Sequence, residues 1–254
     1  MTRYVVISTN NNQDYFNYIP YQEQAWANFG WGLIIMVTPD FNPVNFETRL
    51  KTTLVCQLPK VDEIRTQTLA QMGRLYAAHY VGKDNLLMTC DMDLIPLSNY
   101  WNPGPNKITV YGHDLTDYTY YPMGYVAMSA ENWIEKMQIT PDTRADILRD
   151  CDRTIIKGER AAYSETHETW WNTDWRLLTD RLSPFKDQIT FINRGRRTVP
   201  PNKGVFAFGR VDRGDSMQVP AENLIDMHCE NNNVKHPDKW ARFLSVYEKY
   251  HGKL

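Results

Sequence analysis

The stretch Asn85-Leu-Leu-Met-Thr-Cys-Asp-Met-Asp-Leu-Ile-Pro96 decides the fold, because an apolar run passes directly into two aspartates one residue apart. Asn85–Cys90 is short and apolar, which predicts a strand buried on both faces. In open α/β sheets, ligands bind at the carboxyl ends of the strands. Asp91 and Asp93 would therefore stand where a ligand binds, and their apolar neighbours argue against a solvated acidic loop.

On both sides of this stretch, short apolar runs alternate with amphipathic segments. The pattern predicts strands at Tyr4–Ser8, Leu33–Val37, Asn85–Cys90, Ile108–Tyr111 and Leu224–Met227. It predicts helices at 22–29, 64–80, 129–137, 173–182 and 237–250, a surface helix and loop at 141–162, and a long flexible segment at 194–213. This order is typical of an α/β fold with a central, mostly parallel sheet flanked by helices.

The composition excludes several classes of protein. The 254 residues carry 28 Lys+Arg and 30 Asp+Glu, a net charge of −2, which argues against a dedicated nucleic-acid binder. The four cysteines form no CxxC pair and indicate free thiols in a reducing compartment. The apolar runs are too short for a signal peptide or a transmembrane segment. We therefore expect a soluble, cytoplasmic protein.

The acidic pair has a chemical interpretation of its own. Asp91 and Asp93 concentrate negative charge, which a divalent cation such as Mg²⁺ or Mn²⁺ would relieve through oxygen ligands. Such an ion would neutralise a diphosphate leaving group. The alternative is that both aspartates only terminate a strand in a turn.

A strand followed by Asp-x-Asp and Leu-Ile-Pro-Leu resembles the metal-binding motif of GT-A fold glycosyltransferases, which use nucleotide-sugar donors. Other motifs are similar to the family in the same order, over about residues 4–240: the strand Val5–Asn11, the helix around Gln71–Tyr76, the segment Tyr121–Met128, the acidic motif Trp170–Leu178, and Asp226-Met-His228. The resemblance implies a GT-A (Rossmann-like) fold in one domain, 1–254. Its nucleotide-binding half would be about 1–100, and its acceptor-binding half, with the C-terminal helix, about 101–254.

The resemblance also implies roles for individual residues. Asp91, Asp93 and His228 would hold Mn²⁺ or Mg²⁺. Asp174 would be the catalytic base if the enzyme inverts, and would lie near the sugar if it retains configuration. The donor-binding residues would be Thr9, Asn10, Asn11, Tyr15, Arg74, Asp91, Met92, Trp170, Trp171 and Lys235.

Each assignment has an alternative in the sequence. His228 could be structural, and His113 is a rival ligand. Asp174 could be a first-turn aspartate favoured by the helix dipole. Arg74 could be a surface ion-pair partner, and on a continuous helix it points away from Arg65.

We therefore expect a metal-dependent glycosyltransferase that moves a sugar from a nucleoside diphosphate sugar to a hydroxyl of a glycan or glycoconjugate. A sugar nucleotidyltransferase is one alternative, but it usually has a glycine-rich loop where this chain has Thr9–Asn12. A non-catalytic carbohydrate-binding protein is the other; it would use the 8 Trp and 15 Tyr without needing the acidic pair. The sugar, the nucleotide, the acceptor and the oligomeric state stay open.

Overall fold

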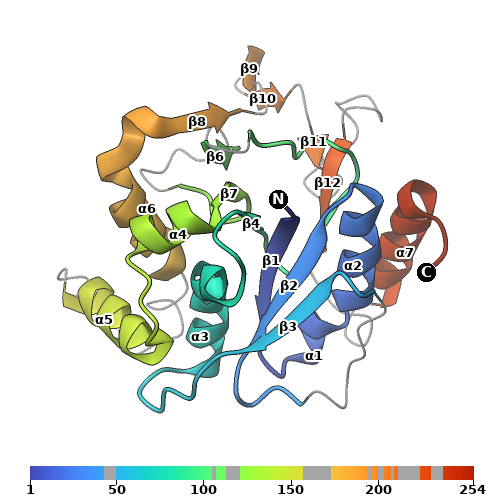
Figure 1. Ribbon diagram of the computed structural model, residues 1–254. Helices are drawn as coiled ribbons and strands as arrows, with labels where there is room; N and C mark the ends of the chain where they lie inside the picture. The colour runs from blue at the N-terminus through green and yellow to red at the C-terminus, as the bar shows by residue number, and fades with distance from the viewer. Residues whose placement is uncertain are drawn as a thin grey trace.

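The computed structural model in Figure 1 describes residues 1–42, 50–104, 107–112, 121–156, 173–193, 196–199, 203–206, 209–210, 224–229 and 237–254, with backbone alone for 152–156 and 196–210. In the described chain, seven strands form the central sheet in the order β3-β2-β1-β4-β7-β6-β8. Their bounds are β1 Arg3–Thr9, β2 Gly32–Val37, β3 Thr53–Gln57, β4 Leu86–Thr89, β6 Ile108–Tyr111, β7 Val126–Ser129 and β8 Ile189–Ile192.

The sheet is mostly parallel, as the sequence predicts. Strands β3, β2, β1 and β4 run in the same direction, β7 is antiparallel to β4 and β6, and β8 is parallel to β6. Alternate residues of β1 enter different layers, since Val5 belongs to one apolar cluster and Val6 to the other. The strand is therefore buried on both faces, which explains its continuous apolar sequence.

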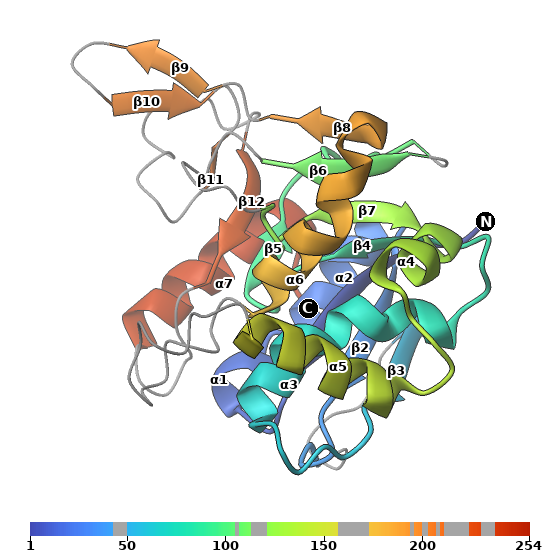
Figure 2. The same cartoon turned by 90° about the vertical axis from the view of Figure 1, so that its left-hand side faces the viewer.

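Helices cover the two faces of the sheet (Figures 1 and 2). One cluster joins the sheet to α2 and α7, and the other joins it to α3, α4, α5 and α6. The helices are α1 Gln13–Phe16, α2 Ile19–Asn28, α3 Thr66–Gly73, α4 Ala130–Met137, α5 Thr143–Ile156, α6 Thr173–Leu182 and α7 Pro237–His251, with 3₁₀ helices η2 Arg74–Tyr80 and η6 Ser183–Gln188. No helix in the described ranges is both long enough and apolar enough to cross a membrane.

A smaller sheet stands beside the carboxyl end of β4. It contains β11 Gly209–Arg210, β12 Leu224–His228 and β5 Leu94–Pro96, in the order β11-β12-β5. Strand β12 is antiparallel to β5, which places His228 opposite Leu94. Because β5 begins directly after Asp93, this pairing brings the end of β12 to the acidic loop.

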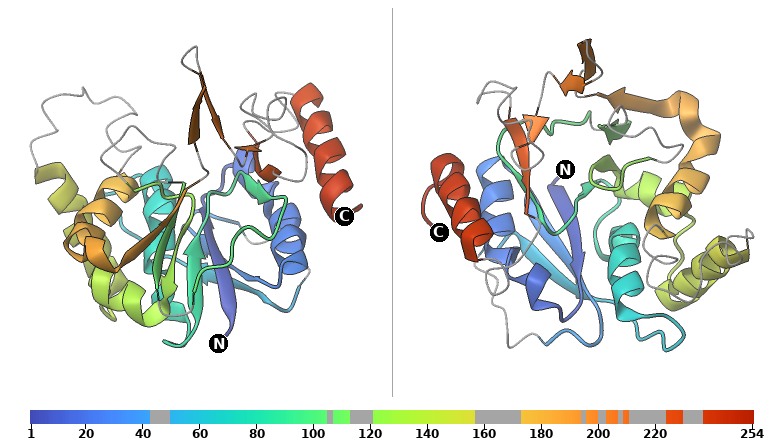
Figure 3. Two further views of the ribbon diagram at one scale, coloured as in Figure 1. Left: turned by 90° about the horizontal axis from the view of Figure 1, so that it is seen from above. Right: turned by 180° about the vertical axis from the view of Figure 1, so that it is seen from behind.

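The C-terminal helix lies along α2, as the rear view in Figure 3 shows. The predicted apolar spacing is confirmed, because Phe243 and Tyr247 are buried and the Trp240 ring contacts Tyr21 of α2 and Tyr18, which directly precedes that helix. The ring of Tyr21 meets the rings of Phe243 and Tyr247 edge-on. Aromatic pairs of this geometry add to the stabilisation from buried area.

Three sequence predictions need correction. The expected helix 64–80 divides into α3 and the 3₁₀ helix η2, and Arg65 has an extended backbone before α3. The rotation argument that separated Arg65 from Arg74 therefore does not apply.

The expected flexible segment 194–213 contains β9 Arg196–Val199 paired with β10 Lys203–Phe206, and also β11. Its basic residues obscured Thr198, Val199, Val205 and Phe206, which are residue types that favour strands.

Candidate functional site

The two motif aspartates lie in the loop between β4 and β5. The Cys90 N–H donates to Val6 O at 2.9 Å, so the chain stays paired with β1 until the loop begins. Asp91 has 35% of its side chain exposed and Asp93 has 17%. Met92, between them, is buried in the apolar cluster on the α2 side. The predicted donor contact of Met92 would therefore fall to its backbone N–H.

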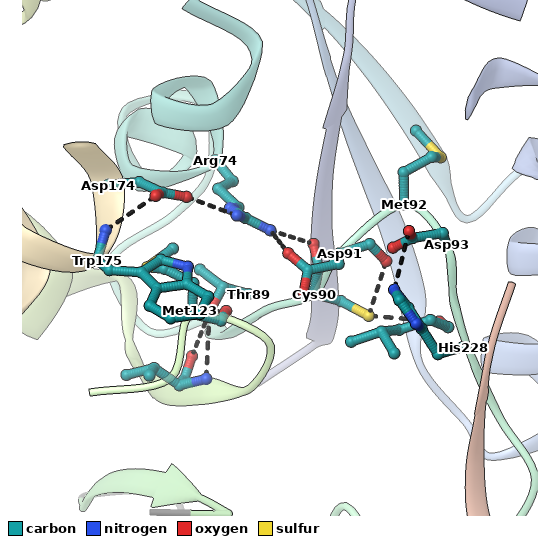
Figure 4. A network of polar contacts seen from close by, with 12 residues as sticks. Arg74, Thr89, Cys90, Asp91, Met92, Asp93, Met123, Asp174, Trp175 and His228 are labelled. Atoms are coloured by element: carbon teal, nitrogen blue, oxygen red, sulfur yellow. Dashed lines mark hydrogen bonds and ion pairs between the residues drawn. The ribbon is translucent and has the colours of Figure 1, made fainter. Parts of the chain in front are cut away.

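Asp93 faces the end of β12. His228 Nε2 lies 3.1 Å from Asp93 Oδ2, with 20% of the His228 side chain exposed (Figure 4). The two residues are distant in sequence and meet because β12 pairs with β5 and the Cys229 N–H donates to Asp93 O at 2.8 Å. The structure thus brings together two of the three predicted metal ligands.

Arg74 joins the other aspartate to α6. Its Nη1 donates to Asp91 Oδ1 and to Cys90 O, the latter at 3.0 Å, and its Nη2 donates to Asp174 Oδ2 at 2.6 Å (Figure 4). Arg74 is only 8% exposed. Burial alone would lower the pKa of its guanidinium, but the carboxylates of Asp91 and Asp174 outweigh burial and raise that pKa. Arg74 is thus a buried cation between two acids, in place of the surface ion-pair partner that was its alternative.

Asp174 lies in the first turn of α6 and is 1% exposed. One carboxylate oxygen accepts from Arg74, and the other accepts from the Trp175 N–H at 2.9 Å. Burial raises the pKa of Asp174, while Arg74 acts in the opposite direction. A general base must come within hydrogen-bond reach of the acceptor hydroxyl. Because both oxygens are engaged below the surface, this arrangement favours the first-turn interpretation of Asp174 over the base.

The predicted nucleotide side follows β1. Thr9 ends that strand and is buried, with its hydroxyl donating to Asn10 O at 2.9 Å. Asn10 is half-buried and Asn11 is exposed, both in the loop before α1. Burial raises the pKa of Tyr15, and the charges of Asp93 and Asp91 raise it further. The Tyr15 hydroxyl is therefore close enough to sense both carboxylates.

Gly124 lies against the acidic loop, next to β7. A Cβ at this position would stand 3.6 Å from Asp91 Oδ2 and 3.2 Å from a methyl group of Leu94. The predicted acceptor-side segment thus borders Asp91. The neighbouring Tyr125 is a core residue, however, with its ring stacked on Trp101 at 3.6 Å and its hydroxyl donating to Asp226 at 3.0 Å.

The donor set is suitable for a hard divalent cation. A carboxylate and an imidazole, Asp93 and His228, already face each other, and Asp91 offers further oxygens in the same loop. Within the described ranges, no group of three His, Cys, Asp or Glu side chains converges in the geometry of a metal site. Asp91 is instead drawn toward Arg74. A three-ligand site would require Asp91 to turn from Arg74 toward Asp93.

Four predicted positions fall outside the described residues: His113, Trp170, Trp171 and Lys235. Conversely, the structure adds Gln22, which the sequence analysis missed and which donates to carbonyls of the acidic loop. The sequence carried no clear signal, because α2 also contains Glu23, Gln24 and Asn28 and a single sequence does not show which of these polar side chains faces the loop.

No protein-family model matches this sequence, and no curated protein matches it either. Among solved structures, the chain is similar to the galactosyltransferase LgtC in complex with donor and acceptor sugar analogues. The identity is 11% and the TM-score 0.54, over 97% of this chain and 96% of LgtC. An active-site mutant of LgtC is similar with 13% identity and a TM-score of 0.50, over 99% of this chain and 100% of that one.

A third similar structure is the glycosyltransferase GlyE of Streptococcus pneumoniae TIGR4, with 15% identity and a TM-score of 0.47 over 76% of this chain. The matched part is 45% of GlyE, so the chain spans less than half of that structure. The likeness to LgtC extends over nearly the whole of both chains and bears on the fold. The predicted GT-A fold is confirmed.

Proposed function

We propose that this chain is a metal-dependent glycosyltransferase that moves a sugar from a nucleoside diphosphate sugar to a hydroxyl of a glycan or glycoconjugate. The observation that carries the proposal is the placement of Asp91, Asp93 and His228 at the carboxyl end of β4, in a chain of GT-A fold. Such enzymes need a concentrated site of oxygen and imidazole ligands where the diphosphate departs, and this loop supplies one.

In this proposal Asp93 and His228 hold the cation, and Asp91 provides a further oxygen. A bound Mn²⁺ or Mg²⁺ would supply electrostatic stabilisation of the charge that develops on the departing diphosphate. The fold of the chain itself brings the two ligands close together. The pairing of β5 with β12 sets the distance of 3.1 Å between Asp93 and His228 before any ion binds.

The donor would lie along the end of β1. Tyr15 is half-buried in α1, directly after the loop that ends β1, which suits a ring that contacts the base or ribose. Thr9, Asn10 and Asn11 form the adjacent loop and offer polar groups to the nucleoside. Trp170, Trp171 and Lys235 keep the donor contacts that the resemblance implies.

In this proposal Arg74 holds Asp91 until the cation binds and Asp91 turns toward it, since the donors of Arg74 are directed to Asp91, Cys90 and Asp174. Asp174 in turn holds Arg74. An inverting reaction still requires a base that accepts the proton of the acceptor hydroxyl. Asp174 is the residue that the resemblance offers for it, and it would have to leave Arg74 to serve.

We place the activity in the cytoplasm. The observation that supports this is the spacing of Cys56, Cys90, Cys151 and Cys229, which form no CxxC pair. Free thiols are typical of reducing compartments.

The proposal is tested with a panel of nucleotide sugars. A bound donor stabilises the folded protein by mass action, so the correct donor should raise the melting temperature, and raise it more with Mn²⁺ present. That donor should then be hydrolysed or transferred only when Mn²⁺ or Mg²⁺ is added. Asp93→Asn should abolish the metal-dependent activity, and Asp62→Asn, at an exposed surface ion pair, should not.

The alternatives give other results in the same assay. Pyrophosphate release from a nucleoside triphosphate and a sugar phosphate would identify a nucleotidyltransferase. Sugar binding that is indifferent to metal, with no turnover of any donor, would identify a carbohydrate-binding protein. Full metal-dependent activity in Asp93→Asn would show that the metal site is wrongly assigned.

A further inference from the structure

We propose that Gln22 is a positioning residue that sets the shape of the loop carrying Asp91 and Asp93. Gln22 lies on α2 and is completely buried. It touches no group that would react, and it acts through the backbone of the loop. The consequence for metal binding rests on the function proposed above, whereas the consequence for the shape of the loop does not.

The side-chain amide of Gln22 faces three carbonyls of the loop. Its Nε2 lies 2.8 Å from Met92 O, 2.8 Å from Leu94 O and 3.3 Å from Asp91 O. An amide nitrogen carries two hydrogens, so the two shorter contacts take one each and the longer one is shared. A single side chain thus gathers the carbonyls on both sides of Asp93.

The orientation of the Gln22 amide is determined by α2 itself. The indole N–H of Trp26, one turn later, donates to Gln22 Oε1 at 2.8 Å. A reversed amide would place its oxygen against three carbonyl oxygens and its NH₂ against the Trp26 donor. Because both bonds are buried, leaving such groups unpaired is costly. Trp26 therefore keeps the donors of Gln22 directed at the loop.

The remaining backbone of the loop is also engaged. The Cys229 N–H donates to Asp93 O at 2.8 Å, and the Leu94 N–H donates to Asp91 O at 3.2 Å. Every carbonyl from Asp91 to Leu94 therefore accepts a hydrogen bond, and three of them accept from Gln22. The direction of each peptide plane determines where the adjoining carboxylate points, so Gln22 pre-sets the separation and aim of Asp91 and Asp93.

The variant Gln22→Glu tests this with almost no change of shape. It keeps an acceptor for the Trp26 N–H and removes the amide donors. Gln22→Met is the uncharged second variant, for use if a buried carboxylate prevents folding. Trp26→Phe is a milder third one that leaves the amide of Gln22 in place and removes the bond that orients it. The control is Gln24→Glu, since Gln24 is on the same helix and donates to Asn28 in an exposed hydrogen bond.

Two measurements are made on each purified protein. Titration with Mn²⁺ alone, followed by electron paramagnetic resonance, should show binding weakened by about 10- to 100-fold in the Gln22 variants and unchanged in Gln24→Glu. Hydrogen exchange should become about tenfold or more faster in residues 91–97, and stay unchanged in β2, because the loop loses donors while the sheet does not. Trp26→Phe should also weaken Mn²⁺ binding and speed hydrogen exchange in residues 91–97, but by less than the Gln22 variants do.

Equal Mn²⁺ affinity in the wild type and in a folded Gln22 variant would overturn the positioning role, even if the melting temperature falls. If the wild type itself binds neither Mn²⁺ nor Mg²⁺, the metal part of the proposed function fails. Hydrogen exchange then decides on Gln22 alone. Faster exchange in 91–97 supports the inference, and unchanged exchange overturns it.

Discussion

Arg74 and Asp174, one hundred positions apart in the chain, form a buried ion pair with Nη2 2.6 Å from Oδ2. The same guanidinium binds Asp91 and the carbonyl of Cys90. A single cation therefore ties the first turn of α6 to the first aspartate of the acidic loop. It also offsets part of the negative charge there, so the stability of the fold and the charge of the candidate site depend on the same residue.

Replacing Arg74 with Met should strongly destabilise the protein. Asp174 would remain buried without its counter-ion, and breaking a buried pair in this way costs about 3–5 kcal/mol. Urea unfolding at neutral pH measures the loss. Arg144→Met is the matched control, because Arg144 pairs at the surface with Glu63 at 3.4 Å, where an ion pair contributes about 0–1 kcal/mol. Equal losses in the two variants would contradict the role of Arg74.

Asp174→Asn distinguishes the two interpretations of Asp174. We expect a loss of stability of about 1–3 kcal/mol, because Arg74 and the Trp175 N–H donate to different carboxylate oxygens, and in Asn one of these becomes an NH₂ donor. Activity at saturating donor and metal should fall by less than about tenfold. A loss of about 10²- to 10⁴-fold in kcat with unchanged stability would instead identify a general base.

His251 should make stability depend on pH. Its Nε2 lies 2.6 Å from Pro96 O, to which it donates, and the Asn28 amide donates to its Nδ1 at 3.2 Å. Burial lowers the pKa of His251 below the ordinary 6.5, and the bond to Pro96 opposes this only in part. The unfolded chain therefore binds the proton first. The contribution of neutral His251 to the free energy of unfolding is complete above the pKa that His251 has in the unfolded chain. It is lost as the pH falls through the lower pKa that His251 has in the folded protein.

The comparison of wild type with His251→Phe isolates this effect. Phe keeps an aromatic ring beside Phe29 and Tyr247 but does not titrate. The difference in unfolding free energy between the two proteins should shrink as the pH is lowered from about 7.5 to about 5. A difference that grows toward acid pH would contradict the half-buried, neutral state of His251.

His228→Ala should separate metal binding from stability. The Asp93–His228 pair is partly exposed, so its loss should change the unfolding free energy by less than about 1 kcal/mol. Mn²⁺ affinity should fall at least about tenfold, since a neutral imidazole is a good ligand for this class of cation. The two quantities are measured by urea unfolding without metal and by Mn²⁺ titration. Unchanged affinity would remove His228 from the proposed metal site.

Much of the fold could be predicted because its signals are local. β1, β2, β4, β6 and β12 are short apolar runs, and α6 and α7 have the spacing of an amphipathic helix. Strand β8, Ile189–Ile192, is such a run and was nevertheless missed, but two other strands that escaped prediction lack the signal. Thr53–Gln57 is a half-exposed edge strand, and Leu94–Pro96 is too short to show a period. Both become strands by pairing with a neighbour, which is a tertiary effect.

The roles of the aromatic residues, likewise, could not be read from local sequence and depend on the tertiary structure. The carbohydrate-binding alternative would use these residues to contact sugars, yet Tyr121 and Tyr125 are buried, and Tyr125 stacks on Trp101. Counting aromatic residues cannot separate a binding platform from a core, because large rings contribute to both.

The sequence by itself determined the strands and helices that carry a local signal, the acidic pair at the end of a buried strand, and the resemblance that singled out Arg74, Asp174 and His228. Only the tertiary structure decided how these residues meet: Arg74 between two carboxylates, His228 beside Asp93, and Gln22 beneath the loop. The physical reason is the separation in sequence of the residues that interact. Periodicity records which face of an element is buried, whereas ion pairs and hydrogen bonds between distant segments exist only once the sheet has brought those segments together.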